Sequence, residues 1–262
     1  MLIHGQPGSG KKAIARHLAA EILGITDIAL DSYPYLQVID APAISSDAIA
    51  SVRKLEHFLS LKVPLPGPIN RVILLTNADA LGHEAQTALL KTIEEPPAKT
   101  LLILTATTVA SLLPTIGSRL QLLPVKRPSK TAISSHFKAA RYASAEIDQA
   151  YAITGGLPGL MTAILDNQTH PLMSATATAR TLLQGSVYER LLLVDGLSKK
   201  RTETIQILYI LQQMSHARLQ ATTGAQFRRW QLILQSSYEA TEQLTNSAQP
   251  KLVLDALILK LN

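Results

Sequence analysis

Short apolar runs alternate with helical patterns through the first 125 residues, and this alternation constrains the fold more than any other feature. The expected strands are Leu2 with Ile3 at the chain start and residues 36–40, 71–75 and 101–105. The expected helices lie at about 11–23, 46–61 and 85–93, and the proline-rich stretch 63–68 is expected to be a loop. Because parallel strands need crossover connections, usually helices, the pattern predicts an α/β domain with a parallel sheet.

The strand signal stops after Pro124. Residues 130–166 are typical of short helices broken at Gly155–Gly159, and from about residue 171 the pattern is helical almost throughout. We therefore predict three parts, an α/β domain at 1–125, a small helical domain at 126–170 and an all-helical C-terminal domain at 171–262.

The composition excludes several classes of protein. The chain has no cysteine, which excludes disulfides, thiolate metal sites and cysteine nucleophiles. Apolar residues make up 47% and charged residues 17%, which excludes a disordered chain. No apolar run approaches the ~18 residues needed to span a membrane, and the start has no apolar signal-peptide core, so we expect a cytoplasmic protein. The seven histidines form no ligand cluster, and we predict no metal site.

The formal charge of +6 is unevenly distributed. Residues 1–125 carry ten basic and ten acidic side chains, so the excess lies in 126–262. Basic clusters occur at Lys199–Arg201 and at Arg228–Trp230. We interpret them as solvated helix faces, with contacts to DNA or to another subunit as the alternative.

Residues 5–11, Gly-Gln-Pro-Gly-Ser-Gly-Lys, match the phosphate-binding pattern G-x-x-x-x-G-K between a predicted strand and a predicted helix. Gly5, Gly8 and Gly10 would let backbone amides curl around phosphate oxygens, aided by the helix N-terminus. Lys11 would reach the outer phosphates. The pattern predicts a P-loop.

Two positions that hold Mg²⁺ in a working P-loop ATPase are changed. Lys12 replaces the Ser or Thr whose hydroxyl binds the cation, and Thr76 and Asn77 stand where the strand should end in Asp or Asp-Glu. Asp79 lies three residues beyond the Asp place and is expected to point elsewhere. Both changes affect the same metal ion, so we predict that this chain does not hydrolyse ATP.

Lys91–Pro97, with Ala88–Leu90 before it, resembles the ALLKTLEEPP signature of bacterial clamp-loader AAA+ subunits. Thr115–Arg119 stands where that family has Ser-Arg-Cys, with Leu120 in place of the Cys. Two further segments resemble the family, Tyr33–Leu36 its His-Pro-Asp-Leu segment and residues 246–261 its last collar helix. The resemblance implies an AAA+ domain, a helical lid and an oligomerising collar. We interpret Glu94 and Glu95, which precede two prolines, as a surface turn that ends a helix.

The residues that this chain lacks point to one type of subunit within this family. Gly159 stands where the motor subunits carry a sensor arginine, and the four cysteines of the usual zinc module are absent. The chain therefore resembles the delta-prime type, a stator that does not hydrolyse ATP. The resemblance implies that Arg119 acts as an arginine finger in the ATP site of a neighbouring subunit, with Ser118 orienting the same turn.

The same resemblance implies cofactors and partners. It implies no required cofactor, with ATP or ADP bound passively and without a well-held Mg²⁺, or no nucleotide at all. The implied partners are the motor (gamma/tau) and delta subunits of a hetero-oligomeric DNA polymerase III clamp loader. Contact with the sliding clamp and primed DNA would be made through the complex, with no membrane.

Two alternatives stay open at this point. The first is an active AAA+ ATPase, a motor subunit or a helicase-like remodeller, in which Asp79 or Glu84 replaces the missing metal ligands. The second is a non-enzymatic DNA-binding module whose P-loop is a relic, which predicts strongly salt-dependent DNA binding by the isolated chain.

Overall fold

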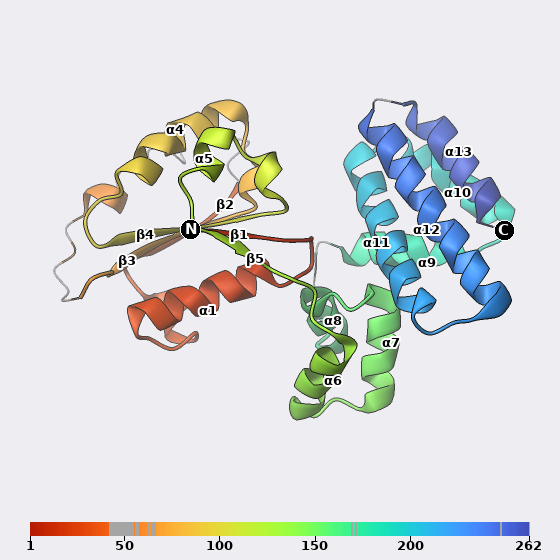
Figure 1. The fold of residues 1–262 in the computed structure, drawn as a ribbon, viewed down its shortest axis with the longest axis horizontal. Coiled ribbons are helices and arrows are strands. Elements are labelled where there is room, and N and C mark those ends of the chain that lie inside the picture. Colours follow the sequence, from red (N-terminus) through yellow and green to blue (C-terminus); the bar gives the residue numbers. More distant parts are fainter. Residues whose placement is uncertain are drawn as a thin grey trace. The chain divides into compact units, whose positions relative to one another are not determined.

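The computed structural model describes residues 1–41, 55, 58–61, 63, 67–168, 170, 172–246 and 248–261. The chain divides into two compact units, Met1–Lys126 and Arg127–Asn262 (Figure 1). The division falls one residue beyond the expected end of the α/β domain. A further division of the second unit near residue 170 stays a prediction.

The first unit contains a five-stranded parallel sheet in the order β2-β3-β4-β1-β5. Its strands are β1 (Leu2–His4), β2 (Leu36–Asp40), β3 (Arg71–Thr76), β4 (Thr100–Ala106) and β5 (Leu122–Pro124). The first four confirm the sequence prediction. The strand β5 was not predicted, because a run of three exposed residues ending in proline carries little strand signal. Proline is tolerated there because β5 is an edge strand.

Helices cover both faces of this sheet. In Figure 1, α1 (Lys11–Leu23) lies on one face, and α4 (His83–Glu94) and α5 (Pro114–Gly117) lie on the other. Alternate residues of β3 face opposite ways, since Val72 and Leu74 join the core on the α1 side, whereas Ile73 and Leu75 join the core on the α4 side. The whole of β3 is therefore buried, as expected for a parallel strand covered on both faces.

Two of the three helices expected in the first unit can be compared with the structure. The expected helices at 11–23 and 85–93 are confirmed by α1 and α4. The expected helix at 46–61 lies mostly outside the described residues, although residues 58–60 are helical. The expected loop at 63–68 lies partly outside them.

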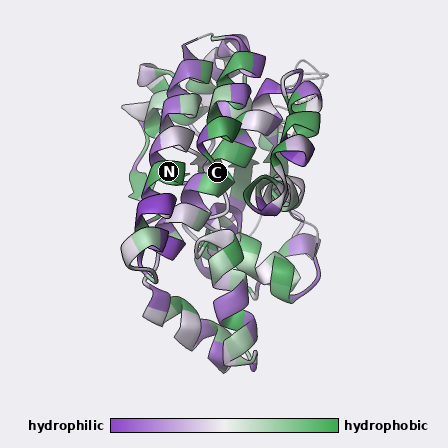
Figure 2. Ribbon diagram, turned by 90° about the vertical axis from the view of Figure 1, so that its right-hand side faces the viewer, coloured by the Kyte–Doolittle hydropathy of each residue, from purple (hydrophilic) through white to green (hydrophobic). Residues whose placement is uncertain are grey.

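The described part of the second unit is helical. Its helices are α6 (Lys130–Ala139), α7 (Ser144–Thr154), α8 (Pro158–Leu165), α9 (Met173–Gln184), α10 (Val187–Leu197), α11 (Arg201–Leu219), α12 (Gly224–Thr245) and α13 (Pro250–Lys260). α11 packs against α7, α9 and α12, and α13 packs against α10 and α12. Figure 2 shows hydrophobic and hydrophilic residues alternating along these helices. No helix of the described residues combines the length and apolar character that crossing a membrane requires.

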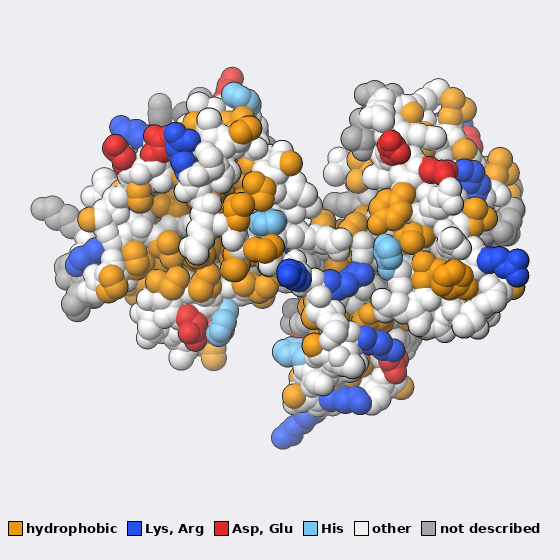
Figure 3. Space-filling model, in the orientation of Figure 1, with side chains coloured by type: hydrophobic (Ala, Val, Ile, Leu, Met, Phe, Trp, Pro, Cys, Tyr) orange, Lys and Arg blue, Asp and Glu red, His pale blue; other side chains and the backbone are white. Residues whose placement is uncertain are grey.

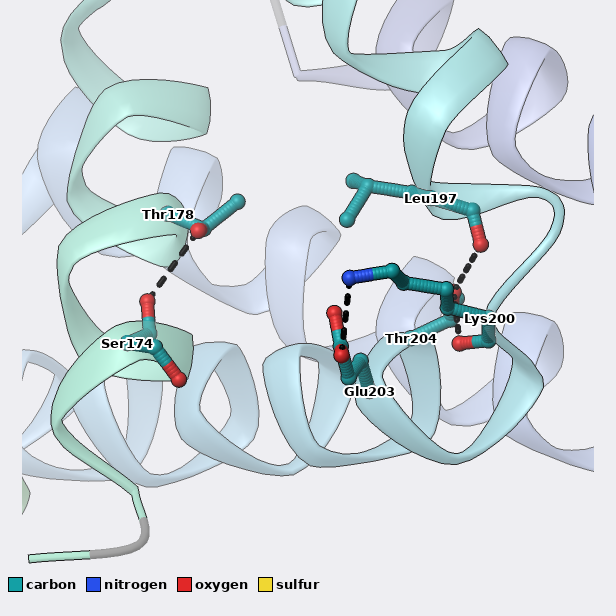
Figure 4. Close-up of polar contacts among 6 residues, drawn as sticks. All are labelled: Ser174, Thr178, Leu197, Lys200, Glu203 and Thr204. Atoms are coloured by element: carbon teal, nitrogen blue, oxygen red, sulfur yellow. Dashed lines mark hydrogen bonds and ion pairs between the residues drawn. The ribbon is translucent and has the colours of Figure 1, made fainter.

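A buried threonine fixes the turn from α10 into α11 (Figure 4). The Thr204 hydroxyl group donates to the carbonyl oxygens of Leu197 at 2.8 Å and Lys200 at 3.2 Å. Both carbonyl oxygens also accept a backbone N–H, from Lys200 and from Thr204 itself, so the hydroxyl group adds a second hydrogen bond to each and ties the end of α10 to the start of α11. Lys200 also forms an ion pair with Glu203 at 3.0 Å in the first turn of α11.

Glycine lets the end of α7 approach α11 closely. Gly155 caps α7 with φ 66° and Gly156 follows with φ 77°. A Cβ atom on Gly155 would lie 2.4 Å from the carbonyl oxygen of Gln213 in α11. Both the left-handed backbone and the close approach therefore require glycine at this position.

Gly155→Ala is expected to lower the free energy of unfolding of the second unit by about 2–4 kcal/mol, because it adds backbone strain and a clash. Gly196→Ala is the matched control. Gly196 lies in α10 with no positive φ and no atom within 4 Å of its Cβ position, so alanine should stabilise by about 0.5–1 kcal/mol. Urea unfolding followed by Trp230 fluorescence measures both, and equal effects would contradict the packing argument.

Two surface ion pairs join α13 to its neighbours. Lys251 pairs with Asp195 of α10 at 2.7 Å, and Lys260 pairs with Glu239 of α12 at 2.9 Å. The hydrogen bond from each lysine lowers the pKa of the carboxyl group it contacts. Exposed pairs of this kind each contribute little to stability.

The stability that these pairs provide is expected to depend on pH. Because the folded pKa of each carboxyl group is lowered, the contribution is present above the unfolded pKa and is lost as the pH falls through the folded one. Asp195→Asn combined with Glu239→Gln should therefore lower the urea midpoint at about pH 7 and have little effect at about pH 2. An equal loss at both pH values would show that packing, not charge, is responsible.

Candidate functional site

Residues 5–10 connect β1 directly to α1. Gly8 has φ 75° and Gly10 has φ 86°, a left-handed backbone that favours glycine, and Gly10 caps α1. Gly5 is needed for a different reason, since a Cβ atom there would lie 2.8 Å from the carbonyl oxygen of Val125. The three glycines thus bend the loop around the N-terminus of α1.

Lys11 folds back over this loop. Its ammonium group donates to the carbonyl oxygens of Gly5 at 2.7 Å and Gln6 at 2.9 Å. Burial lowers the pKa of Lys11, and the negative charge of Asp79 partly offsets that shift. The lysine is therefore at the position from which a P-loop lysine reaches a phosphate group.

In the residues that the structure describes, the loop and the start of α1 also contain a hydroxyl group without a hydrogen-bond partner and two cations without an acidic neighbour in the same turn. The buried Ser9 hydroxyl group has no hydrogen-bond partner among the described residues. Lys11 and Lys12 occupy the first turn of α1, which has no acidic residue and where the helix dipole disfavours cations. An anion at this helix N-terminus would complement all three groups, so the residues fit a phosphate group.

The two positions that hold Mg²⁺ ligands in a working P-loop ATPase here carry Thr76 and Asn77, which contact a carboxylate of the neighbouring strand. The Thr76 hydroxyl group donates to Asp40 Oδ1 at 2.7 Å, and the Asn77 amide nitrogen donates to the same oxygen at 2.9 Å. Asp40 ends β2 and is paired in register with Thr76. Thr76 and Asn77 thus act as hydrogen-bond donors. Among the described residues, no group of three or more possible metal ligands occurs.

The expectation that Asp79 points away from this site is wrong. Asn77 adopts a left-handed conformation with φ 54°, and the chain turns into a short 3₁₀ helix, η2 (Ala78–Ala80). Asp79 accepts a hydrogen bond from the Thr107 backbone at 3.2 Å, just beyond β4, and its charge acts on Lys11. The turn at Asn77, rather than a shift in strand register, directs Asp79 towards the P-loop. Glu84 is exposed in the first turn of α4.

Arg119 lies on the surface in a fixed position. Its Nε atom is 2.5 Å from Glu94 Oε1, and its terminal nitrogen donates to the carbonyl oxygen of Thr115 at 2.9 Å. The Ser118 hydroxyl group accepts from Arg119 at 3.4 Å and donates to Thr115 at 3.3 Å. The Arg119 side chain is 42% exposed. One edge of the guanidinium group is therefore held while the group stays accessible.

The sequence analysis missed the partner of Arg119. Glu94 is the last residue of α4, which ends there as expected before Pro96 and Pro97. It lies 25 positions before Arg119 and comes close only because α4 and α5 pack together. The sequence shows Glu94 and Glu95 before two prolines, but nothing in it indicates that Glu94 contacts Arg119. Gly159, at the place of the sensor arginine, lies in the first turn of α8.

Comparison with known proteins agrees with this geometry. A family model described as "DNA polymerase III, delta subunit" matches residues 1–129. The match covers just under half of the chain. It confirms the clamp-loader resemblance of the sequence for the first unit.

Two curated proteins are similar to about half of this chain. DNA polymerase III subunit delta' of Pseudomonas aeruginosa is 33% identical over 133 residues, covering 45% of this chain and 40% of that protein. The replication factor C small subunit of Methanosarcina mazei is 32% identical, covering 51% of this chain and 38% of that protein. The matched part therefore spans about two-fifths of these relatives.

One solved structure is similar over nearly the whole chain. A DNA polymerase III gamma subunit-related protein from Thermotoga maritima matches with a TM-score of 0.50 and 15% identity, covering 99% of this chain and 92% of that one. At this identity the likeness shows the fold alone.

Placing the acidic pair of working P-loop ATPases at residues 76 and 77 is expected to destabilise the first unit. Thr76→Asp with Asn77→Glu would replace two donors to Asp40 with two carboxylates, one of them buried, and lower stability by about 1–3 kcal/mol. Adding Asp40→Asn should recover part of that loss, because it removes the charge that the new carboxylates face. Native-state hydrogen exchange of β2 and β3 measures the change, and unchanged protection in the double variant would contradict this account.

Proposed function

We propose that this chain is a delta-prime-like stator of a clamp loader, which does not hydrolyse ATP itself and supplies Arg119 to the ATP site of a neighbouring subunit. The observation that carries the proposal is the contrast between its two candidate sites. Thr76, Asn77 and Lys12 offer no carboxylate to a metal ion, whereas Arg119 is exposed and held in place by Glu94 and Ser118.

The chain's own P-loop would hold a nucleotide passively. Loop amides, Lys11 and the Ser9 hydroxyl group would bind the phosphate groups, which fits the unpaired hydroxyl and the cations at the start of α1. Lys12 would repel Mg²⁺, which supplies the charge neutralisation that hydrolysis relies on. Binding at this site would therefore be structural and would not lead to turnover.

Arg119 suits a role in trans for chemical reasons. A guanidinium group stays charged at neutral pH and presents several donors in one plane, which matches the oxygens of a phosphoryl group. Its Nε atom contacts Glu94 and one terminal nitrogen contacts the turn at Thr115. On assembly, the remaining N–H groups would donate to the phosphoryl oxygens of the neighbouring site, while Glu94 and the turn at Thr115 keep the other edge in place.

The second unit carries the apolar surface that a collar would need. Exposed large apolar side chains lie on α10, α12 and α13, and Figure 3 shows such side chains over the helices of this unit. They include Tyr188, Leu191, Leu192, Leu232, Tyr238, Leu252 and Leu259. Exposed apolar surface of this kind favours contact with other proteins. The proposed partners are motor and delta subunits, with the clamp and primed DNA engaged by the assembled complex.

The deciding experiment is ATP turnover with a sliding clamp and primed DNA present. It compares this chain alone, a motor subunit with a delta subunit, and that mixture completed with wild type or Arg119→Ala. We expect no turnover by the chain alone, and about 10³-fold lower turnover with Arg119→Ala than with wild type. Gel filtration of the completed mixtures shows whether the variant still assembles.

Arg16→Ala is the matched control. Arg16 is also a surface arginine of the first unit in an ion pair, with Asp31 at 2.7 Å, and its loss should leave turnover unchanged. Turnover by the chain alone would identify an active ATPase, in which Asp79 serves the metal. Full turnover with an assembled Arg119→Ala complex would exclude the arginine finger.

A further inference from the structure

A cavity of about 390 Å³ lies among helices of the second unit. Its lining comes from α7, α9, α11 and α12, which are labelled in Figure 1. Small-molecule sites in proteins typically have volumes of about 300–1,000 Å³, so this cavity can hold one group of nucleotide size. It is separate from the P-loop and from Arg119, which belong to the first unit.

Three arginines from three helices line this cavity. They are Arg180 of α9, Arg218 of α11 and Arg229 of α12, and no acidic residue is among the lining residues. Within the described part of the chain, no side-chain hydrogen bond or ion pair engages any of the three guanidinium groups. The charge of Arg229 adds to the effect of burial in lowering the pKa of Arg190. All three arginines are exposed, so the cavity presents three positive charges to solvent with no acidic side chain in its lining.

The rest of the lining is apolar or neutral. Trp230 lies next to Arg229 in the sequence and is half-buried, and Ile153, Leu183 and Met214 provide further apolar surface. Ala152 and the amides of Gln149 and Gln184 complete the lining. An indole beside guanidinium groups suits a ligand that combines an anion with a flat apolar ring.

We propose that this cavity, the Arg180–Arg218–Arg229 pocket with Trp230, binds single-stranded nucleic acid, with a phosphate group on the arginines and a base against the indole. Phosphate contacts and base stacking on aromatic side chains are the two features that single-strand binding sites combine. This function goes beyond the proposed stator role and does not depend on it.

An acidic peptide fits the cavity less well. Carboxylates would pair with the arginines, but an extended peptide also needs backbone partners at a strand edge. All the lining residues belong to helices, whose interior backbone groups are already hydrogen-bonded. An acidic segment also lacks a flat ring for Trp230, whereas every nucleotide carries one.

The test uses Trp230 as the reporter, because it is the chain's only tryptophan. The full chain is titrated with an oligothymidylate of about twelve nucleotides, at about 50 mM and about 200 mM salt. We expect quenching of the tryptophan fluorescence and weaker binding at the higher salt concentration. Inorganic phosphate and a peptide of glutamates are titrated in parallel and should quench far less.

Matched variants separate the pocket from general positive charge. Arg229→Gln should weaken binding by about 5–10-fold, whereas Arg228→Gln should change it by less than about twofold. Both arginines are exposed in the same helix turn, but only Arg229 lines the cavity. Trp230→Ala should weaken binding by about tenfold, measured by the anisotropy of a labelled oligonucleotide. Circular dichroism checks that each variant is folded.

Three results would overturn this inference. The first is the absence of quenching by the oligonucleotide at the lower salt concentration. The second is an equal loss of binding in the Arg228 and Arg229 variants, which would indicate a diffuse charge effect. The third is quenching by the glutamate peptide alone, which would assign the pocket to an acidic protein segment. None of them bears on Arg119, whose test is turnover in the assembled complex.

Discussion

The parallel arrangement of the five strands is the constraint on which the first unit depends. Because every strand runs the same way, their carboxyl ends meet at one edge of the sheet, and the chain leaves each strand there. The P-loop after β1, the donors after β3 and the Thr107 amide after β4 are brought together by this geometry alone. β5 completes it, since Val125 beyond this strand packs against Gly5.

The same edge shows why the residues can fit a phosphate group where the usual metal ligands are absent. A phosphate site is built mainly from backbone amides and one lysine, so it depends on glycine conformation and on the start of α1. A metal site depends on a few side chains, which can change without disturbing the strands. Here Thr76 and Asn77 donate hydrogen bonds to the carboxylate that ends β2.

Most of the sheet and the helix pattern could be predicted because apolar periodicity is local. β5 could not, since three residues at an edge carry too little pattern, and its pairing with β1 is a long-range contact. The glycines of the P-loop were found from a motif, and their conformations agree with it. The positions of Asp79 and Glu94 were not predictable. One follows from a left-handed asparagine and the other from the packing of two helices, and neither leaves a periodic signal.

The contact between Arg119 and Glu94 has a consequence for the thermodynamics of assembly. A free arginine side chain has about 2 kcal/mol of rotamer entropy, part of which must be lost when the side chain is fixed in a binding partner. Glu94, Thr115 and Ser118 already restrict this side chain within the isolated chain. Part of the ordering is therefore completed during folding. In the proposed assembly, less ordering would then remain to oppose association, and the short turn at α5 would preorganise Arg119 for the neighbouring subunit.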